Sequence, residues 1–286
     1  MTTPRQTEPA IVARAVNSRL RVGRLTQAGQ AITLTQTDAT TCGPTCLLAA
    51  RLLLEPGQRA AVTDDLAQEM TASPLGREGK QLMSILSRQQ LRLQRAMNVH
   101  GLGVLPWPKA LGSTPWSVAR QMTEIASTCT PGSGRRRYTV RWVSDRGSAW
   151  GSEVASIREA LTGGLPVILV TGGPLVLDDD DAEGEPTARA RLRASLARTP
   201  AVPRHYVLAL PWRAIGQDDP GEGSMHVYEP SSGSVRVLDL TAPRDPHRPG
   251  PRELGNWPRV LAVIAPGFVN SYKYGGWLHV DEVSFR

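Results

Sequence analysis

A Gly- and Arg-rich turn over residues 131–137 divides the 286-residue chain into two parts of different texture, and this division limits the folds open to it. Before the turn, apolar residues recur at helical spacing over 42–54, 62–70, 79–97 and 114–125, after a short strand-like stretch at 31–35. After the turn, strand-like alternation occurs over 138–143, 167–170, 206–210, 226–228, 235–238 and 260–264, with one helical stretch over 153–161. Helices that precede antiparallel strands predict an α+β fold, with a mainly helical part over 31–130 and a mainly β part over 138–286.

Two segments are predicted to lie outside the core of this domain, which spans 31–286. Residues 1–30 are polar and basic with weak helical potential, and we expect them to form an N-terminal arm. Residues 173–202 are predicted to be an insertion, in which the acidic run 178–181 precedes a basic helix. The acidic run lacks the alternating ligands and central Gly of a calcium loop, so we expect a solvated loop. Our hypothesis is that this insertion gates the functional site; unchanged activity and substrate range after deletion of 178–199 would overturn it.

The charge and hydropathy of the chain exclude some functions. A net charge of +7 and an isoelectric point near 9.8 come almost wholly from dispersed arginines, and no nucleic-acid-binding motif is present, so no nucleic-acid partner is predicted. The most apolar run, Leu161 to Leu177, is short and broken by Gly and Pro, so no membrane span is predicted. The N-terminus lacks the basic-then-apolar pattern of a secretory signal. We expect a cytoplasmic protein, or one exported without a conventional signal peptide.

The chain has three cysteines, Cys42, Cys46 and Cys129. An odd and sparse set argues against a disulfide scaffold, and a structural zinc site needs a second pair of ligands that the sequence lacks. Glycine-rich phosphate-binding loops are also missing from the sequence. We therefore expect Cys46 and Cys129 to be small buried apolar residues, and we expect no metal or organic cofactor.

Cys42 differs from the other two cysteines because it opens an apolar helix. Gln36 precedes it by six residues in the sequence Gln-Thr-Asp-Ala-Thr-Thr-Cys-Gly-Pro-Thr-Cys. The first turn of a helix has unpaired N–H groups and the positive end of the macrodipole, where a thiol loses its proton more readily. Pro44 suits this turn, and we expect Gly43 to leave room beside the sulfur for a substrate backbone. Gln36 is placed to donate its side-chain amide to an oxyanion on the attacked carbonyl.

Together with later segments, this spacing resembles the papain-like cysteine peptidases, and most closely the bacterial branch that includes the double-glycine leader peptidases of bacteriocin exporters. The similar blocks occur in the family's order: Gln36 with 42–45, then the helix, glycine turn and strand of 157–170, then the histidine strand 205–210, then the turn 227–233. The resemblance implies two lobes with a cleft between them, and a thioester mechanism on a peptide or protein substrate. In that mechanism Cys42 is the nucleophile and His205 the base. Glu229 orients the base, and Gln36 is an oxyanion donor.

Two positions depart from the family pattern. Arg204 precedes His205 where the family usually has Gly, and Glu229 is one methylene longer than the usual Asp or Asn. His226 also lies near Glu229 in the sequence, but we expect His205 to be the base because it begins an apolar strand in the family position. The remaining histidines, which we expect at the surface, are His100, His247 and His279. Two alternatives stay open: a deamidase or transglutaminase-like effector or toxin with the same site, and a catalytically inactive papain-like module that binds a peptide or protein.

Overall fold

The computed structural model describes residues 12–23, 31–54, 78–99, 101, 106–129, 137–177, 195–197 and 199–267. The helix predicted over 62–70 and the acidic run of the insertion lie outside these ranges. Of the insertion proposed as a gate, 173–202, the structure describes residues 173–177, 195–197 and 199–202. His100, His279 and the side chain of Cys129 also lie outside what is described.

The helices within the described ranges are α1 (Cys42–Leu54), α3 (Glu78–Val99), η1 (Lys109–Leu111), α4 (Pro115–Cys129), α5 (Trp150–Thr162) and η2 (Arg252–Leu254). Each α-helix coincides with a predicted one, although α5 begins at Trp150 rather than Glu153. At the start of α4 the Thr114 hydroxyl accepts the N–H of Ser117 at 3.3 Å, and Pro115 occupies the first helical position. Among the described residues, no helix combines the length and the apolar character needed to cross a bilayer.

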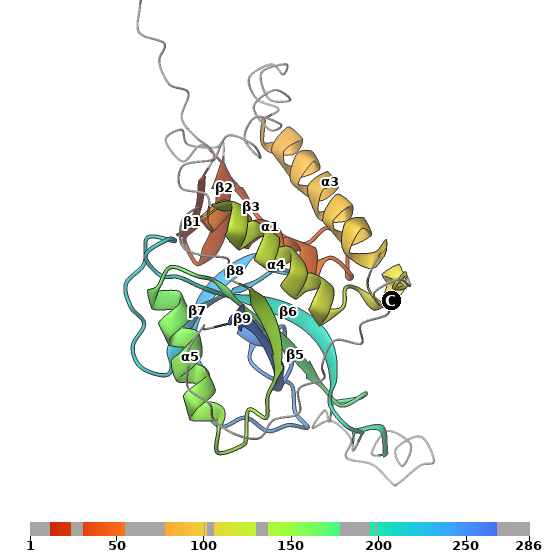
Figure 1. Cartoon of the computed structure of the whole chain (residues 1–286), viewed down its shortest axis with the longest axis vertical. Coiled ribbons are helices and arrows are strands. Elements are labelled where there is room, and N and C mark those ends of the chain that lie inside the picture. The colour runs from red at the N-terminus through yellow and green to blue at the C-terminus, as the bar shows by residue number, and fades with distance from the viewer. Residues whose placement is uncertain are drawn as a thin grey trace, which may run out of the picture.

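The strands of the described residues join in one antiparallel sheet: β1 (Val12–Val16), β2 (Arg19–Gly23), β3 (Ile32–Thr33), β4 (Tyr138–Trp142), β5 (Val167–Gly173), β6 (Val202–Leu210), β7 (Ser224–Glu229), β8 (Ser234–Asp239) and β9 (Arg259–Pro266). Their order is β1-β2-β8-β7-β6-β5-β9-β4, with β3 paired to β2 (Figure 1). Mixed helices and antiparallel strands confirm the α+β prediction at this level.

Helices cover both faces of the sheet. Arg141 and Trp142 are neighbours in β4, so their side chains point to opposite faces. Trp142 contacts Trp116 of α4, with ring centroids 6.2 Å apart, whereas Arg141 is paired with Glu153 of α5. α1 packs against both α4 and β6, so α1 and α4 share one face and α5 lies on the other (Figure 1).

The segment predicted as an N-terminal arm over 1–30 contributes strands where it is described, and the expected helical tendency is wrong there. β1 and β2 form a hairpin whose turn residues, Asn17 and Ser18, have φ angles of 50° and 55°, as a type I′ turn requires. Leu20 and Val22 of β2 are fully buried and alternate with arginines. β2 also pairs with β8. The period-two alternation, which buries one side of β2 in the sheet, outweighs the weak helical tendency.

The core lies between α1 and the central strands. Leu47 of α1, Val207 of β6 and Val227 of β7 are all fully buried. The hydroxyl of the buried Tyr228 donates to the carbonyl oxygen of Leu34 at 3.0 Å. This bond joins β7 to the segment that leads into α1, so it fixes the start of α1 relative to the strand that ends at Glu229.

Candidate active site

Cys42 is the first residue of α1 and lies in a buried first turn. The loop before it is closed by the Thr41 hydroxyl, which accepts the N–H groups of Thr37 and Asp38, each at 3.0 Å. The Thr41 carbonyl accepts the N–H of Thr45 at 2.9 Å and so begins the helical ladder. Cys42 is 5% exposed. Its own N–H belongs to the first turn, whose donors have no partner within the helix.

Gly43 faces packed side chains, so the expectation that it leaves room for a substrate backbone is wrong. A Cβ at this position would lie 3.4 Å from Val118 Cγ2 and 3.5 Å from Tyr206 Cδ2. The Tyr206 hydroxyl donates to the carbonyl oxygen of Ser113 at 2.6 Å, just before α4. A Cβ at Gly43 would thus make ordinary van der Waals contacts with α4 and with β6, the strand that also carries His205.

His205 in β6 lies between Cys42 and Glu229. Its Nε2 is 2.8 Å from Oε1 of Glu229, the last residue of β7. Cys42 lies close enough to His205 to raise the pKa of the imidazole, and because Nε2 is taken by Glu229, the ring nitrogen left to face the thiol is Nδ1. All three residues are buried, with exposed fractions of 5%, 9% and 2% for Cys42, His205 and Glu229. The structure thus brings these three sequence-predicted residues together.

The contacts within this group set its protonation. Burial lowers the pKa of His205, but hydrogen bonds to Cys42 and Glu229 and the charges of both outweigh burial and raise the pKa to about 9. Burial raises the pKa of Glu229, but hydrogen bonds from His205, Ser231 and Ser232 outweigh burial and lower that pKa to about 2. At neutral pH the contacts therefore favour a cationic imidazole beside the carboxylate of Glu229.

The turn that follows β7 immobilises the Glu229 carboxylate. Its Oε1 accepts the Ser231 N–H at 2.8 Å and the Ser231 hydroxyl at 2.7 Å, and its Oε2 accepts the Ser232 N–H at 2.8 Å. The N–H of Gly233 donates to the Glu229 carbonyl oxygen at 2.8 Å, with Gly233 at a left-handed φ of 68°. The sequence predicts a Glu-Pro-Ser-Ser-Gly turn, but the turn's serines as carboxylate donors were not predicted. These hydrogen bonds hold the Glu229 carboxylate in one position, although its side chain is one methylene longer than that of Asp.

The segment after η2 packs against the ring of His205. Gly255 has a φ of 68°, and a Cβ there would lie 2.4 Å from Cδ2 and 2.9 Å from Nε2 of His205. The Thr171 hydroxyl of β5 donates to the Leu254 carbonyl oxygen at 3.0 Å, and Thr171 is the cross-strand partner of His205. Gly255 is a further site residue that sequence reasoning missed, because only the fold brings it to the histidine.

Gln36 lies beside the same group through its main chain. Its N–H donates to the carbonyl oxygen of Pro230 at 2.8 Å, one residue beyond Glu229. The residue is half-buried, and its Oε1 is buried without a hydrogen-bond partner in the part of the chain that is described. The backbone of Gln36 is therefore held at the Glu229 turn, while no partner fixes its side chain through the oxygen.

The other predicted residues that the structure describes lie apart from this group. His226, the rival base, has its Nε2 3.0 Å from the carbonyl oxygen of Asp218, and His247 is exposed as predicted. The guanidinium of Arg204, the residue before His205, lies 5.8 Å from the ring centroid of Trp257.

Cys46 is fully buried, as predicted, one helical turn after Cys42. Its Sγ lies 3.5 Å from the carbonyl oxygen of Tyr206. Burial raises its pKa well above the ordinary value, as do the charges of Cys42 and Glu229. Cys46 is therefore a neutral core residue that serves as an internal reference for the reactivity of Cys42.

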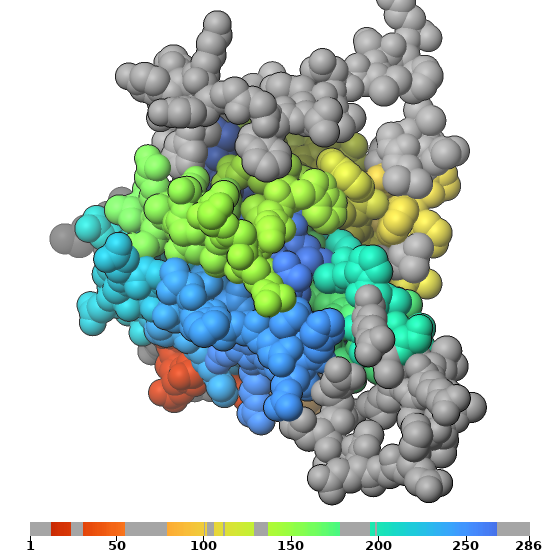
Figure 2. Space-filling view, turned by 90° about the horizontal axis from the view of Figure 1, so that it is seen from below, coloured from red at the N-terminus to blue at the C-terminus, as the bar shows by residue number. Residues whose placement is uncertain are grey.

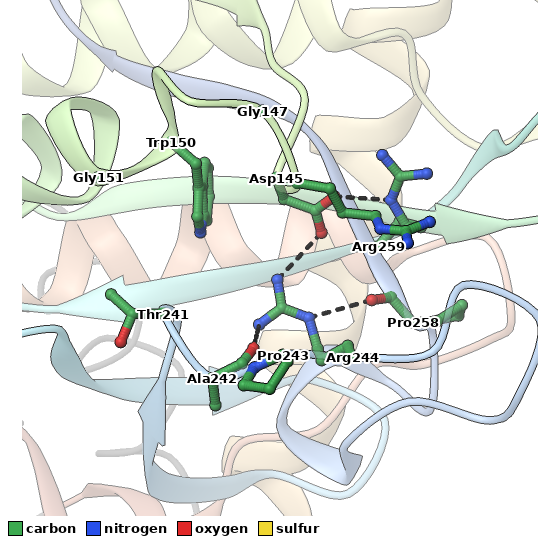
Figure 3. Close-up of a pocket in the computed structure, with 11 residues that line it drawn as sticks. Asp145, Gly147, Trp150, Gly151, Thr241, Ala242, Pro243, Arg244, Pro258 and Arg259 are labelled. Carbon is green, nitrogen blue, oxygen red and sulfur yellow. Dashed lines mark hydrogen bonds and ion pairs between the residues drawn. The ribbon is translucent and has the colours of Figure 1, made fainter.

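A separate hollow of about 430 Å³ opens where the segment before α5 meets the segments after β8 and before β9. Figure 2 shows this face, with the green surface around α5 against the blue surface of the later segments. Asp145 is one of the residues that line the hollow, and its buried carboxylate is 3.0 Å from Arg244 and 2.6 Å from Arg259 (Figure 3). Asp145 also accepts the N–H of Val260 at 2.8 Å, and Arg244 donates to the Pro258 carbonyl oxygen at 3.1 Å. These bonds join three segments, and we interpret the cluster as a structural clamp.

Within the residues that the structure describes, no group of three or more His, Cys, Asp and Glu side chains is arranged to hold a metal ion. No protein-family model matches the chain, and neither the curated proteins nor the solved structures include a significant match. The function has to be argued from the Cys42–His205–Glu229 group itself.

Proposed function

We propose that this protein is a papain-like cysteine hydrolase that cleaves a peptide or isopeptide bond. The observation that carries the proposal is the placement of His205, whose imidazole lies beside the helix-start Cys42 and is hydrogen-bonded to the buried carboxylate of Glu229. A cysteine with a purely structural role needs neither a base nor an acid that orients the base. A thiol nucleophile needs both, because its reactive form is the thiolate.

In the proposed reaction His205 takes the proton of Cys42 through Nδ1, which gives a thiolate and an imidazolium. Glu229 accepts the hydrogen bond from Nε2–H and keeps the ring in this orientation. The thiolate attacks the carbonyl carbon, and the N–H of Cys42 and the amide of Gln36 stabilise the oxyanion. His205 then protonates the leaving amine, the C–N bond breaks, and an acyl-thioester remains on Cys42. Water, deprotonated by His205, hydrolyses the thioester and releases the acid.

Alkylation of the native protein with iodoacetamide tests whether this group is assembled. We expect Cys42 to react at neutral pH about 10-fold or more faster than in His205→Ala, because the variant has no base to hold the thiolate. Mass spectrometry of the digested protein assigns the label, and Cys46 is the reference thiol in the same helix. Cys46→Ala is the matched control and should leave the rate at Cys42 unchanged.

Labelling of Cys42 that is no faster than labelling of Cys46, or that is unaffected by His205→Ala, would contradict the proposal and favour an inactive binding module. For a reactive Cys42, incubation of a cell extract with wild type or Cys42→Ala identifies the bond. New N-termini produced by wild type alone indicate peptide hydrolysis. New Glu residues at former Gln positions indicate a deamidase instead.

A further inference from the structure

Gln90 of α3 makes hydrogen bonds to both neighbours of Gln36. Its Nε2 donates to the Thr35 carbonyl oxygen at 2.9 Å, and its Oε1 accepts the N–H of Thr37 at 2.9 Å. The Thr37 hydroxyl donates to the same Oε1 at 2.8 Å. The buried carboxamide of Gln90 therefore hydrogen-bonds the backbone on both sides of Gln36, the candidate oxyanion donor.

These bonds hold Gln36 as if it were the middle strand of a sheet. In an extended chain the carbonyl of one residue and the N–H two residues later point to the same side, and the groups of the residue between them point to the other. Gln90 bonds Thr35 and Thr37 from one side, whereas the Gln36 N–H donates to Pro230 on the opposite side. A primary carboxamide suits this place because it has a donor and an acceptor in one plane, like a peptide group.

Gln90 is 1% exposed, so its amide cannot replace these hydrogen bonds with hydrogen bonds to solvent water. Gln94, one turn later in α3 and equally buried, bonds the same loop further along: its Nε2 donates to the Thr40 carbonyl oxygen at 3.0 Å and to the Thr40 hydroxyl at 2.7 Å. The two glutamines share residue type, helix and burial. Only Gln90 brackets Gln36, and this makes Gln94 a matched control.

We propose that Gln90 is a positioning residue that fixes the main chain of Gln36, so that the Gln36 amide reaches the oxyanion formed at Cys42. This inference rests on the proposed function. An oxyanion donor works only within about 2.7–3.1 Å of the developing charge, and a shift of about 1 Å costs on the order of 100-fold in rate. Gln36 has no partner for its own Oε1 among the described residues, so the backbone is the part through which its position is set.

Two reagents that differ in their need for an oxyanion donor test this role. Iodoacetamide alkylates the thiolate by displacement of iodide at a methylene carbon, and no oxyanion forms. With p-nitrophenyl acetate the thiolate adds to the ester carbonyl and an oxyanion forms; the C–O bond then breaks, releasing p-nitrophenolate and leaving acetyl-Cys42. Water releases acetate. The rate measured with Cys42→Ala is subtracted as background.

We expect Gln90→Met, which keeps the volume and removes the amide, to slow acylation of Cys42 about 10-fold or more and to leave alkylation within about 2-fold of wild type. Gln94→Met should slow acylation by less than about 3-fold, because Thr40 does not flank Gln36. Gln90→Glu keeps the acceptor for Thr37 and loses the donor to Thr35, so it should fall between Gln90→Met and wild type. Gln90→Glu is the second variant if Gln90→Met does not fold, and urea unfolding first establishes that it is folded.

A double variant links the effect to Gln36. Gln36→Ala alone should slow acylation on the order of 100-fold, and adding Gln90→Met or Gln90→Glu to it should have no further effect. The inference is overturned if Gln90 variants slow acylation and alkylation equally, if they slow neither, or if their effect persists in the Gln36→Ala background. A wild-type Cys42 that is inert to both reagents overturns the proposed function itself, which is a distinct result.

Discussion

The ring of His205 occupies the space that a side chain on Gly255 would need. A Cβ at Gly255 would lie 2.4 Å from Cδ2 of the imidazole, far inside van der Waals contact. The absence of a side chain at Gly255 therefore leaves the space in which the imidazole reaches Glu229.

We expect Gly255→Ala to suppress the reactivity of Cys42, because the added methyl must push the imidazole away from Cys42 and Glu229. Displacement of a catalytic group by about 1 Å costs on the order of 100-fold in rate. Stopped-flow acylation by p-nitrophenyl acetate and alkylation by iodoacetamide measure the loss, and both reagents should be affected.

Gly216→Ala is the control for this substitution. Gly216 has a φ of 70°, and a Cβ there would meet nothing within 4 Å. Both substitutions strain a left-handed residue by about 1–2 kcal/mol, so both should lower the free energy of unfolding. If Gly216→Ala reduces the reactivity of Cys42 as much as Gly255→Ala does, global strain and not the contact with His205 explains the loss.

Replacement of the Glu229 carboxylate by an amide should lower the pKa of His205. That pKa is about 9 in part because Glu229 accepts a hydrogen bond from the ring and carries a negative charge. Glu229→Gln keeps the size of the side chain and removes the charge, so the pKa should move toward the ordinary value of 6.5. An NMR titration of the ring Cε1–H signals measures it, with the His205 signal assigned by its loss in His205→Ala. A pKa that stays near 9 would show that Cys42 alone sets it.

The pair of His205 and Glu229 should also make stability depend on pH. The pKa of His205 is raised from 6.5 to about 9 in the folded state, so its contribution is complete below about 6.5 and is lost as the pH rises through 9. The pKa of Glu229 is lowered from 4.5 to about 2, so its contribution is complete above about 4.5 and is lost as the pH falls toward 2. The free energy of unfolding of wild type should exceed that of Glu229→Gln most between these limits, at about pH 4.5–6.5.

Urea unfolding followed by tryptophan fluorescence, at about pH 5.5 and about pH 10, measures this difference. We expect it to shrink at the higher pH, where the imidazole is neutral in both states. A difference that is constant over this range would mean that packing, and not charge, accounts for the effect of Glu229→Gln.

Removal of the Asp145 carboxylate should destabilise the fold strongly. Its side chain is 1% exposed and pairs with Arg244 and Arg259, so Asp145→Ala removes the carboxylate partner of two guanidinium groups and the acceptor of the Val260 N–H. Loss of one partner of a buried ion pair typically costs about 3–5 kcal/mol. Urea unfolding at neutral pH gives the free energy directly.

Asp219→Ala is the comparison. Asp219 also pairs with an arginine, Arg158, at 2.8 Å, but it lies in solvent, where the pair contributes little. Equal effects of the two substitutions would contradict the assignment of the Asp145 cluster as a structural clamp.

The helices and strands were largely predictable because apolar periodicity decides them locally. The start of α1 at Cys42 follows from Gly43-Pro44, and the start of α4 from Thr114-Pro115. The β1–β2 hairpin was missed because arginines alternate with Leu20 and Val22, and Asn17-Ser18 is a weaker turn signal than Asn-Gly. The arginines of β2 therefore made its alternating strand pattern look like a polar, basic segment.

The candidate site was predictable only in part, for a different reason. Cys42, His205 and Glu229 each lie in a recognisable local sequence. These local sequences occur in the same order as in papain-like peptidases, and this order predicted that the three side chains lie together. Gln90 and Gly255 have no local signal: one is a glutamine in an amphipathic helix, and the other a glycine in a turn. Their roles exist only through contacts between segments far apart in the chain, which periodicity cannot specify.

The proposed nucleophile, Cys42, and its proposed base, His205, come from opposite halves of the sequence, and the ribosome makes them in a fixed order. α1 with Cys42 emerges early, whereas β6, the Glu229 turn and Gly255 follow much later. Until β6 docks against α1, Cys42 is an unassisted thiol on a nascent chain. Any thiol reactivity conferred by His205 therefore requires that β6 has been synthesised and has packed against α1, so its onset is coupled to folding of the second half of the chain.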